Sequence, residues 1–534
     1  MLGKRLLSLL LFLGLFFLSA SRVAAASYYF DSINGDDEYS GDGADTAWQT
    51  LTPLRNINLE PGDTVYFKRG SSWDTGYAYG SLSSNLGLVI DNSGTATQPI
   101  TFTAYGEGPA PVFSNSYSAI QYVRAFTIQS SYIRMEQLAI RDVKEAGIYI
   151  TASSTYVTLD SLDISRTAHA IAILGSHNVI SNSRLHDTFM LANNDDDGDN
   201  DSGAVGVLLM GSYNVIQRNI IENNLQQSFD YGTDGGAVEL HNEGNLVEGN
   251  IIQHNIIRNN DTVTEVGGYG NPTFINNVFA YNLLVNNSRL ATIHNSGTFG
   301  ASIAGLQFHN NTIYENTAEW TGIQATRSKD GVITFGDAPT SGMLELKNNI
   351  FWIQGINKVS NFDTFDHDYN LYYLGSGTAS IPLSSNEIEG APLFVSLGTT
   401  KNFHLQSGSP ARNAGLSLEY IEDLDRNTVP QESIPDLGAY EYAATPVTPV
   451  PSPSVSPSPS LLPSPNPSPL PSVSPGPGCT GAVDINNDGR VNIFDFAMMS
   501  DLFFEKEGIA AVDLNCDGKV NVIDFAILSE SFEL

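Results

Sequence analysis

The stretch from Tyr213 to Gly268 decides the fold. It reads YNVIQRNIIENN (213–224), DGGAVELHN (234–242), GNLVEGNIIQHNIIRNN (244–260) and DTVTEVGG (261–268). Apolar and polar residues alternate in each Asn-rich piece, and Val and Ile are enriched, which is the period-two pattern of a strand with one buried face. The same phrase recurs on both sides of this stretch, so the chain is built from repeated coils.

Asparagine marks the repeat. Aligning the phrases gives intervals of 37, 31, 27, 34 and 38 residues between Asn182, Asn219, Asn250, Asn277, Asn311 and Asn349. Earlier, YIRMEQLAI and YVTLDSLDI recur 24 residues apart, from Tyr132 to Tyr156. Coils of at least two dozen residues with insertions at certain corners predict an all-β parallel β-helix solenoid, with a propeller or a sandwich as the alternative. We expect the Asn side chains to stack into a ladder at one corner, each amide bonding the coils above and below.

Residues 1–26 predict a secretory signal. Two basic residues precede the apolar run from Leu6 to Leu18, and small residues follow, so we expect cleavage after Ala25 or Ala26. A membrane anchor is the alternative, but the apolar run is short for a bilayer. Because no later segment of the sequence is apolar enough to cross a membrane, we expect a secreted, extracellular or cell-surface protein.

Composition narrows the class of partner. The chain has 58 acidic and only 25 basic residues, a formal net charge of -33, which argues against nucleic acid. This charge favours a neutral partner or an acidic one bridged by metal. The 48 glycines suit a turn-rich all-β fold. Cys479 and Cys516 permit one disulfide in an exported chain, and two free thiols are the alternative.

Both ends of the region 27–443 carry family motifs. The opening contains YYFDSINGDDEYSGDGADTAWQTL and LEPGDTVYFKRGSSW, and the closing part contains GAPLFVSLGTTKNFHLQSGSPARNAG, DLDRNTVP and PDLGAYEY. These resemble the N-terminal cap and the closing coils of secreted right-handed parallel β-helix proteins of the pectate-lyase-like superfamily. The resemblance implies the fold. It does not imply the chemistry, because this superfamily hosts lyases, hydrolases, epimerases and adhesins.

Residues 444–478 are expected to form a spacer. From 445 to 478 the sequence has 13 prolines and no charged residue. Such a tract cannot build a core and adopts extended polyproline, spanning at most ~100 Å at ~3.1 Å per residue. We therefore expect residues 479–534 to be a separate module.

Two twelve-residue loops in residues 479–534 predict calcium binding. Each has carboxylate or amide side chains at positions 1, 3, 5, 9 and 12, a glycine at position 6 and a backbone carbonyl at position 7. Two solvated acidic loops are the alternative. The predicted ligands are Asp484, Asn486, Asp488, Arg490, Asn492 and Asp495, then Asp513, Asn515, Asp517, Lys519, Asn521 and Asp524.

One helical stretch follows each loop, FAMMSDLFF and FAILSESF. Paired loops with single following helices resemble a dockerin, a small α-helical module that attaches exported enzymes to a cohesin-type scaffold. The chain departs from clostridial dockerins at loop positions 10 and 11, where Ile493 with Phe494 and Val522 with Ile523 replace small hydroxyl residues. The resemblance implies two Ca²⁺ ions and a cohesin partner whose identity is open.

Two glutamates align on the outside of neighbouring coils. Aligning GIYI, AIAI, GVLL, AVEL, VTEV and ATIH gives the outward series Tyr149, Ala172, Leu208, Glu239, Glu265 and Thr292. Coils ~4.8 Å apart would hold the two carboxyl groups at roughly 5–6 Å, near the spacing of a retaining glycosidase pair. Asp234 in the turn TDGGAVE joins them, and the DGGAVE strand resembles sequences among β-helix glycosidases, including some β-xylosidases.

We therefore predict Asp234, Glu239 and Glu265 as catalytic, with Glu265 as acid/base and Asp234 or Glu239 as nucleophile. The alternatives are a calcium site or two solvated surface acids. Substrate-binding candidates are His241, His294 and Trp320, against turn histidines and a packed tryptophan. Tyr269 offers a further stacking face. In NNDDDGDNDSG, the acids from Asp195 to Asp201 suggest a further calcium ion or a flexible acidic rim.

The resulting hypothesis is a secreted carbohydrate-active enzyme that hydrolyses O-glycosidic bonds of a polysaccharide or oligosaccharide. One alternative is a calcium-dependent polysaccharide lyase, which needs a basic residue. The cations Lys144, Arg166, Arg184 and Arg218 do not align with the acidic strand positions. The other alternative is a glycan-binding or surface protein without catalysis. Product chemistry separates the three, because a lyase leaves unsaturated ends, a hydrolase leaves reducing ends and a binder leaves neither.

Overall fold

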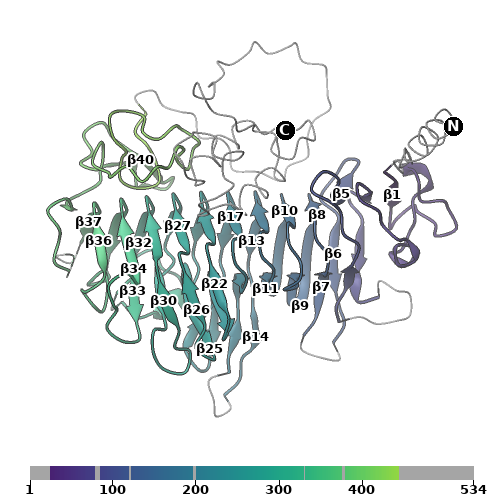
Figure 1. Cartoon of the computed structure of the whole chain (residues 1–534), viewed down its shortest axis with the longest axis horizontal. Coiled ribbons are helices and arrows are strands. Elements are labelled where there is room, and N and C mark those ends of the chain that lie inside the picture. Colours follow the sequence, from purple (N-terminus) through teal and green to yellow (C-terminus); the bar gives the residue numbers. More distant parts are fainter. Residues whose placement is uncertain are drawn as a thin grey trace, which may run out of the picture.

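The computed structural model describes residues 25–77, 85–118, 122–195, 200–329, 331–375, 379 and 381–443. These residues form a long parallel β-helix, in which strands of successive coils stack side by side (Figure 1). The signal segment up to residue 24, the Pro-rich spacer, both predicted calcium loops and the two cysteines lie outside the described residues. Within the described part, no helix has the length and apolarity that a membrane crossing requires.

The first face of the coil is a sheet of 12 parallel strands. In sheet order they are β1 (Ser27–Phe30), β2 (Thr64–Lys68), β5 (Ile100–Tyr105), β8 (Ile133–Glu136), β10 (Thr158–Asp160), β12 (Val179–Ser181), β17 (Val215–Gln217), β23 (Ile251–Gln253), β27 (Val278–Ala280), β31 (Leu306–His309), β34 (Leu344–Lys347) and β36 (Asp366–Asp368).

The second face is also parallel and begins with β3 (Ser72–Asp74) and β6 (Val112–Asn115). It continues through the first halves of β9 (Ala139–Ile150) and β11 (Asp163–Ile173), which run on into the third face. After these come β13 (Arg184–His186), β18 (Ile220–Glu222), β24 (Ile256–Arg258), β28 (Leu283–Val285), β32 (Thr312–Asn316), β35 (Ile350–Gln354), β37 (Leu371–Leu374) and β38 (Ile388–Glu389).

The third face carries the predicted acids, and its outer side is called the acid face below. It consists of β4 (Leu88–Ile90), β7 (Arg124–Ile128), the second halves of β9 and β11, β16 (Val205–Leu209), β21 (Gly236–Glu243), β25 (Thr264–Tyr269), β29 (Ala291–Ile293) and β33 (Ile333–Phe335).

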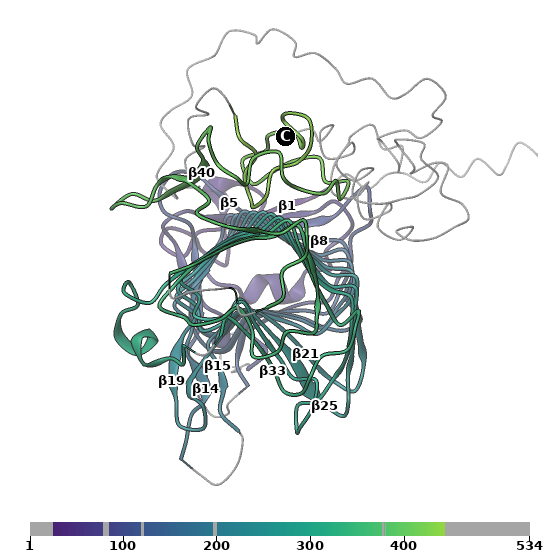
Figure 2. The same cartoon turned by 90° about the vertical axis from the view of Figure 1, so that its left-hand side faces the viewer.

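Shorter elements decorate the coil. Two antiparallel hairpins are inserted before the acid face, β14 (Met190–Ala192) with β15 (Ser202–Gly203) and β19 (Gln226–Ser228) with β20 (Gly232–Asp234). Figure 2 shows them on the side of the coil opposite to β40. The remaining elements are η1 (Ala44–Thr46), η2 (Thr52–Asn56), η3 (Thr75–Tyr77), η4 (Gly322–Thr326), the small sheet β22 (Leu246–Glu248), β26 (Thr273–Ile275) and β30 (Ser302–Ala304), and the pair β39 (Phe394–Ser396) and β40 (Asn402–Leu405).

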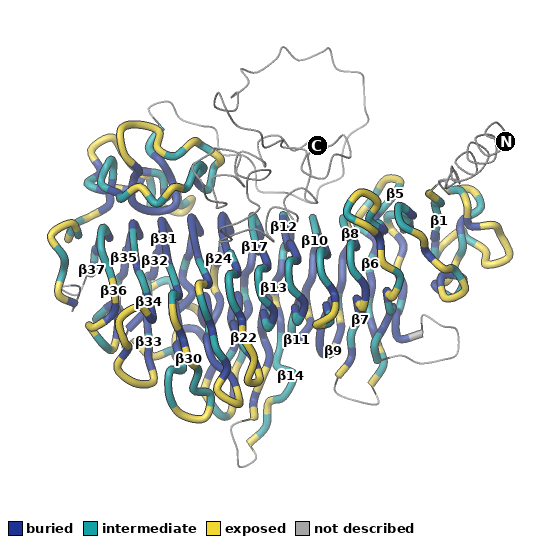
Figure 3. Tube along the Cα trace, viewed as in Figure 1, coloured by how far each residue is buried: buried dark blue, intermediate teal, exposed yellow. Residues whose placement is uncertain are grey.

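Apolar side chains fill the inside of the coil. Along β21, Val238 and Leu240 are fully buried while Glu239 between them is not, as strand alternation requires. Figure 3 shows buried and intermediate residues along the stacked strands and exposed residues mainly in the loops and the end segments. Aromatic residues stack between coils in this core, with Phe279 and Phe308 4.8 Å apart. The hydrophobic pattern of the sequence therefore encodes the coil directly.

Asparagine ladders join the coils, as the sequence predicts, but there are three ladders rather than one. Each amide nitrogen donates to the next side-chain oxygen at 2.8–3.1 Å wherever amides pair. In the third ladder the backbone N–H of Asn224 makes the first link, at 3.0 Å to Asn260 Oδ1. The ladders are Asn178, Asn214, Asn250 and Asn277; Asn219, Asn255, Asn282, Asn311, Asn349 and Asn370; and Asn224, Asn260 and Asn287.

The sequence alignment of the repeats is therefore partly wrong. Asn219 stacks on Asn255 rather than Asn250, and Asn282 rather than Asn277 leads to Asn311. Each of these slips is five residues, the distance between one ladder and the next within a coil. Asn182 belongs to no ladder, because its amide donates to Asp160 instead.

The C-terminal segment does not close the end of the coil, contrary to what its resemblance to closing coils implies. It folds back along the side of the β-helix (Figure 1). Arg218 pairs there with Glu422, Tyr420 bonds His309 at 3.0 Å, and the amide of Asn310 donates to the Asp436 carbonyl at 3.1 Å. These contacts span 111 to 204 residues of sequence, so the segment braces several coils at once.

Candidate active site

The register places the two glutamates side by side. Glu239 on β21 pairs with Leu208 on one side and with Glu265 of β25 on the other. The rest of the aligned series, Tyr149, Ala172, Leu208 and Thr292, falls in the same column, so the alignment of this face is confirmed. Neighbouring strands lie ~4.8 Å apart, and both side chains are partly exposed, 24% for Glu239 and 35% for Glu265.

Each glutamate has a histidine partner. His294 Nε2 lies 2.8 Å from Glu265 Oε1, and His241 Nδ1 lies 3.5 Å from Glu239 Oε1. His241 stands in register with Gly267. A Cβ on Gly267 would lie 2.9 Å from the Cβ of His294, so only glycine leaves this histidine its place against Glu265. The structure thus brings together four of the residues predicted from sequence.

Asp234 reaches the same face from the hairpin β19–β20. The glycine after it adopts a left-handed conformation with φ of 127°, and a Cβ there would lie 2.6 Å from the Asn224 carbonyl oxygen. Burial, reinforced by the negative charges of Glu265, Glu239 and Asp261, raises the pKa of Asp234 well above its ordinary value. Asp234 is therefore a carboxyl group that keeps its proton where exposed aspartates have lost it.

Glu239 is held in the opposite state. Burial acts to raise its pKa, but His241, His169 and His294 outweigh that effect and hold the pKa of Glu239 below its ordinary value. The pKa of His241 is raised in turn: burial opposes its charge, and the bond to Glu239 prevails. Two neighbouring carboxyl groups with pKa values pushed apart are what acid/base chemistry needs.

Sequence reasoning missed three residues of this site. His169 on β11 contributes to the lowered pKa of Glu239, although burial lowers the pKa of His169 itself and so opposes its charged form. Asp261 and Arg327 form a buried ion pair at 2.5 Å, and Arg327 Nη1 donates to Thr233 Oγ1 at 2.6 Å, next to Asp234. None of the three shares the repeat position of the glutamates, so no periodic signal pointed to them.

The acidic insertion that contains Asp201 is hydrogen-bonded to the hairpin β19–β20, which carries Asp234. The carboxylate of Asp201 accepts bonds from Ser228 Oγ and from the backbone N–H of Phe229, both at 2.7 Å. Asp230 reciprocates by accepting from the N–H of Asp201 at 3.0 Å. Residues 196–199 of the insertion lie outside the described residues, so the further calcium ion stays a prediction; among the described residues no group of three acids, histidines or cysteines is arranged for a metal.

Trp320 does not offer a face for a sugar ring. It is 5% exposed and packs within the main core cluster, so protein covers its ring. Tyr269 is the other aromatic residue that the sequence suggests as a stacking face. It is 43% exposed at the end of β25 and lies edge-on to His241, with ring centroids 6.1 Å apart.

The cations considered for a lyase are largely engaged elsewhere. Arg166 pairs with Asp142, Arg184 with Glu222, and Arg218 with Glu422. Each of these pairs lies away from the column of Glu239 and Glu265.

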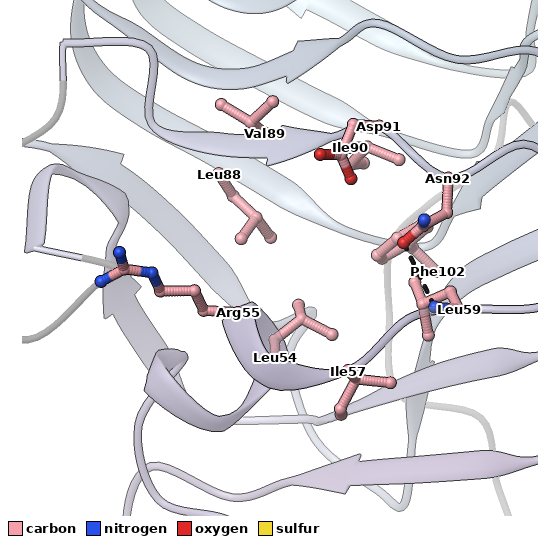
Figure 4. A pocket seen from close by; sticks show the side chains of 10 residues that line it. All are labelled: Leu54, Arg55, Ile57, Leu59, Leu88, Val89, Ile90, Asp91, Asn92 and Phe102. Atoms are coloured by element: carbon pink, nitrogen blue, oxygen red, sulfur yellow. Dashed lines mark hydrogen bonds between the residues drawn. The ribbon is translucent and has the colours of Figure 1, made fainter.

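A separate pocket of about 210 Å³ opens near the N-terminal end (Figure 4). Most of its lining residues are of apolar type, including Leu54, Leu88 and Phe102, and Asn92 Oδ1 accepts from the Leu59 N–H at 3.2 Å. It is lined by β4, whose coil precedes that of β21 by five strands of the third face, so about 24 Å separates them at ~4.8 Å per strand. The pocket therefore plays no part in the acid site.

Comparison with known proteins identifies two regions. Residues 87–363 match the model of the right handed beta helix region, and residues 482–533 match the dockerin type I domain. No curated protein matches the chain. The right-handed solenoid and the C-terminal dockerin are thus both as the sequence predicts.

Three solved structures illustrate the fold similarity. A pectate lyase, Pel9A, aligns over 78% of this chain and 96% of its own, with 17% identity and a TM-score of 0.55. A rhamnogalacturonan lyase aligns over 70% of this chain and 91% of its own, with 17% identity and a TM-score of 0.45. The GH136 lacto-N-biosidase from Eubacterium ramulus aligns over 68% of this chain and 67% of its own, with 14% identity and a TM-score of 0.39. At 17% identity, the likeness to Pel9A concerns the fold alone.

Proposed function

We propose that this chain, which belongs to the right-handed β-helix family, is a secreted carbohydrate-active enzyme that hydrolyses O-glycosidic bonds of a polysaccharide or oligosaccharide. The observation that carries the proposal is the pairing of Glu239 with Glu265 across neighbouring coils, beside a third carboxyl group, Asp234, in the opposite protonation state. Hydrolysis of a glycosidic bond requires a protonated acid and an ionised carboxylate within a few ångströms of the scissile bond.

The protonation states assign the roles. Asp234 gives its proton to the departing glycosidic oxygen, while the ionised Glu239 attacks the anomeric carbon and forms a glycosyl ester. Asp234, now a carboxylate, then takes a proton from water as the water oxygen attacks the anomeric carbon. The bond from that carbon to Glu239 breaks, so Glu239 is again a carboxylate and Asp234 is again protonated. This differs from the sequence-based expectation that Glu265 is the acid/base.

Glu265 and the exposed aromatic ring complete the site. The bond between His294 and Glu265 fixes the Glu265 carboxylate, which accepts a hydrogen bond from a hydroxyl of the sugar in the −1 position. Tyr269 supplies a flat apolar face of the kind that stacks on a sugar ring. Together they orient the ring over Glu239, and orientation is worth several orders of magnitude in rate.

The dockerin type I domain adds a proposed site of attachment to a partner outside the cell. Its two loops would hold two Ca²⁺ ions through the twelve residues from Asp484 to Asp524 named above, and its partner would be a cohesin-type scaffold outside the cell. The Pro-rich spacer would let the catalytic β-helix reach substrate at different positions around that attachment point.

A polysaccharide lyase is the second candidate, and Arg289 is the observation that favours it. Arg289 is half-buried beside the coil of Glu265, bonds Thr292 Oγ1 at 3.5 Å and makes no ion pair with any residue the structure describes. A lyase would use such a cation on a uronate. Hydrolysis remains the better account, because the carboxyl groups occupy the centre of the face.

The test is a screen of neutral and acidic plant and microbial glycans, with and without calcium, followed by substitution. E239Q should reduce turnover on the substrate found by several orders of magnitude and leave the unfolding temperature unchanged. The matched control is E389Q, which neutralises an exposed glutamate on the second face. Wild-type turnover in E239Q would refute the assignment.

A further inference from the structure

The ion pair of Arg327 and Asp261 lies buried next to the acid site. The two side chains are 7% and 8% exposed, with Arg327 Nη2 2.5 Å from Asp261 Oδ2. Arg327 also donates to the backbone carbonyl of Asp261 at 3.4 Å and to Thr233 Oγ1 at 2.6 Å. One guanidinium thus joins three segments that are far apart in the sequence: the loop after η4, the turn before β25 and strand β20.

Strand β20 passes the effect of this contact to Asp234. Thr233 and Asp234 are consecutive in β20, so their side chains point to opposite sides of the strand. Arg327 grips the strand through the buried hydroxyl of Thr233, which leaves Asp234 directed away from Arg327 along the strand's other side. The far side of the hairpin is already fixed by Asp201 through Ser228 and Phe229.

The pair is an unfavourable way to stabilise a fold. Asp261 Oδ1 and Arg327 Nε are buried and have no hydrogen-bond partner within the described chain. Most buried polar atoms in proteins are paired, and a buried ion pair is often no better for stability than apolar residues of the same volume. This cost points to a role in the neighbouring site.

Charge gives that role. Asp234 faces the negative charges of Glu265, Glu239 and Asp261, and Arg327 is the cation that opposes them. Arg289 acts on Asp261 and Arg327 from the next coil. We propose that Arg327 and Asp261 are positioning residues that fix β20, orient Asp234 toward Glu239 and Glu265, and set the net charge around it. The inference rests on the proposed function in taking Asp234 as the proton donor.

Substitution of Asp261 separates this role from a structural one. In D261N a negative charge near Asp234 disappears and Arg327 is left unbalanced, and both changes favour the ionised form of Asp234. The alkaline limb of the pH profile of kcat/KM, which reports Asp234 in the free enzyme, should move to lower pH by roughly one unit. An alkaline limb at the wild-type position would overturn the charge role.

The double variant D261N/R327M removes both charges. The alkaline limb of its kcat/KM profile should therefore return to near the wild-type position. Its kcat/KM should stay roughly 10–100-fold low, because Thr233 has lost its donor and Asp234 its orientation. It should also fold at least as well as D261N, since no unpaired buried charge remains. A double variant with wild-type kcat/KM would overturn the positioning role.

K329M is the matched control, because it removes a cation from the same loop whose Nζ lies 5.9 Å from the Trp320 ring. It should keep the wild-type limb and turnover. If the wild type hydrolyses none of the glycans, the proposed function fails, and the inference is tested separately by ¹³C NMR of aspartate carboxyl groups. The resonance missing in D234N must then titrate at lower pH in D261N than in wild type; an unchanged titration would contradict the inference.

Discussion

At the scale of single residues, the proposed mechanism depends on pKa values that are shifted in opposite directions in neighbouring carboxyl groups. Asp234 is surrounded by negative charge and holds its proton, whereas Glu239 is surrounded by histidines and loses its proton. A proton donor must be protonated, so activity falls as pH rises through the pKa of Asp234. A nucleophile must be ionised, so activity also falls as pH drops through the pKa of Glu239.

His241 sets the acid limb of that profile. Its bond to Glu239 favours the ionised carboxylate, so H241A should raise the pKa of Glu239. The acid limb of kcat/KM should then move to higher pH by about one unit, with the alkaline limb little changed. The measurement is the pH profile of kcat/KM for wild type and H241A. If both limbs stay in place, His241 does not control Glu239.

At this scale the sequence was informative where the period of two applies. The alternation in β21 and β25 gave the outward positions of Glu239 and Glu265, and Asp234 followed from the glycine-rich turn. His169 was not predictable because it follows a shift of register within β11. Asp261 and Arg327 were not predictable because they lie in a turn and a loop, where strand alternation does not apply. Trp320 was misjudged because it also lies outside the strands, where its burial in the core could not be derived from alternation.

At the scale of elements, the Asn ladders explain both the success and the error of the repeat alignment. Asn214, Asn219 and Asn224 are spaced by five residues within one coil, and each begins or continues a different ladder. Because the flanking apolar pattern is the same at all three, a phrase can be aligned to the wrong ladder without any loss of match. The fold class survives such a slip, but the register does not.

The third ladder ends on a buried carboxyl group. Glu315 accepts from the backbone N–H of Asn287 at 2.7 Å, and burial raises the pKa of Glu315 to about 8. The unfolded chain loses this proton near the ordinary value of 4.5, so the folded protein loses stability as pH rises from about 4.5 to about 8. The slope is at most about 1.4 kcal/mol per pH unit.

E315Q should remove that dependence, because glutamine keeps an acceptor for Asn287 and does not titrate. The free energy of unfolding of E315Q, relative to that of wild type, should therefore increase as pH rises from 5 to 8. Denaturant titration at each pH measures this difference. E389Q, an exposed substitution, should parallel wild type. A constant difference between E315Q and wild type would show that Glu315 is ionised throughout this range.

At the scale of the whole molecule, the chain combines a β-helix solenoid with a dockerin type I domain. The β-helix has one continuous core, and the C-terminal segment braces its side through Glu422, Tyr420 and Asp436. Nothing in the Pro-rich spacer can carry a core. We therefore expect residues 27–443 and residues 479–534 to unfold independently.

Calorimetry with and without a chelator tests this division. Removing calcium should abolish the transition of residues 479–534, because their acidic loops repel one another without the cation, and leave the β-helix transition unshifted. Proteolysis within the spacer should also leave residues 27–443 folded. A β-helix transition that moves after cutting would place the domain boundary elsewhere.

The central claim, hydrolysis by the carboxyl groups of the acid face, is tested most directly by mass spectrometry of glycan products formed in ¹⁸O-labelled water. Hydrolysis through a glycosyl ester of Glu239 predicts one ¹⁸O atom at each new reducing end, no unsaturated uronate, and no labelled product from E239Q. Products that lack the label and carry an unsaturated uronate, or labelled products from E239Q at the wild-type rate, would contradict the account.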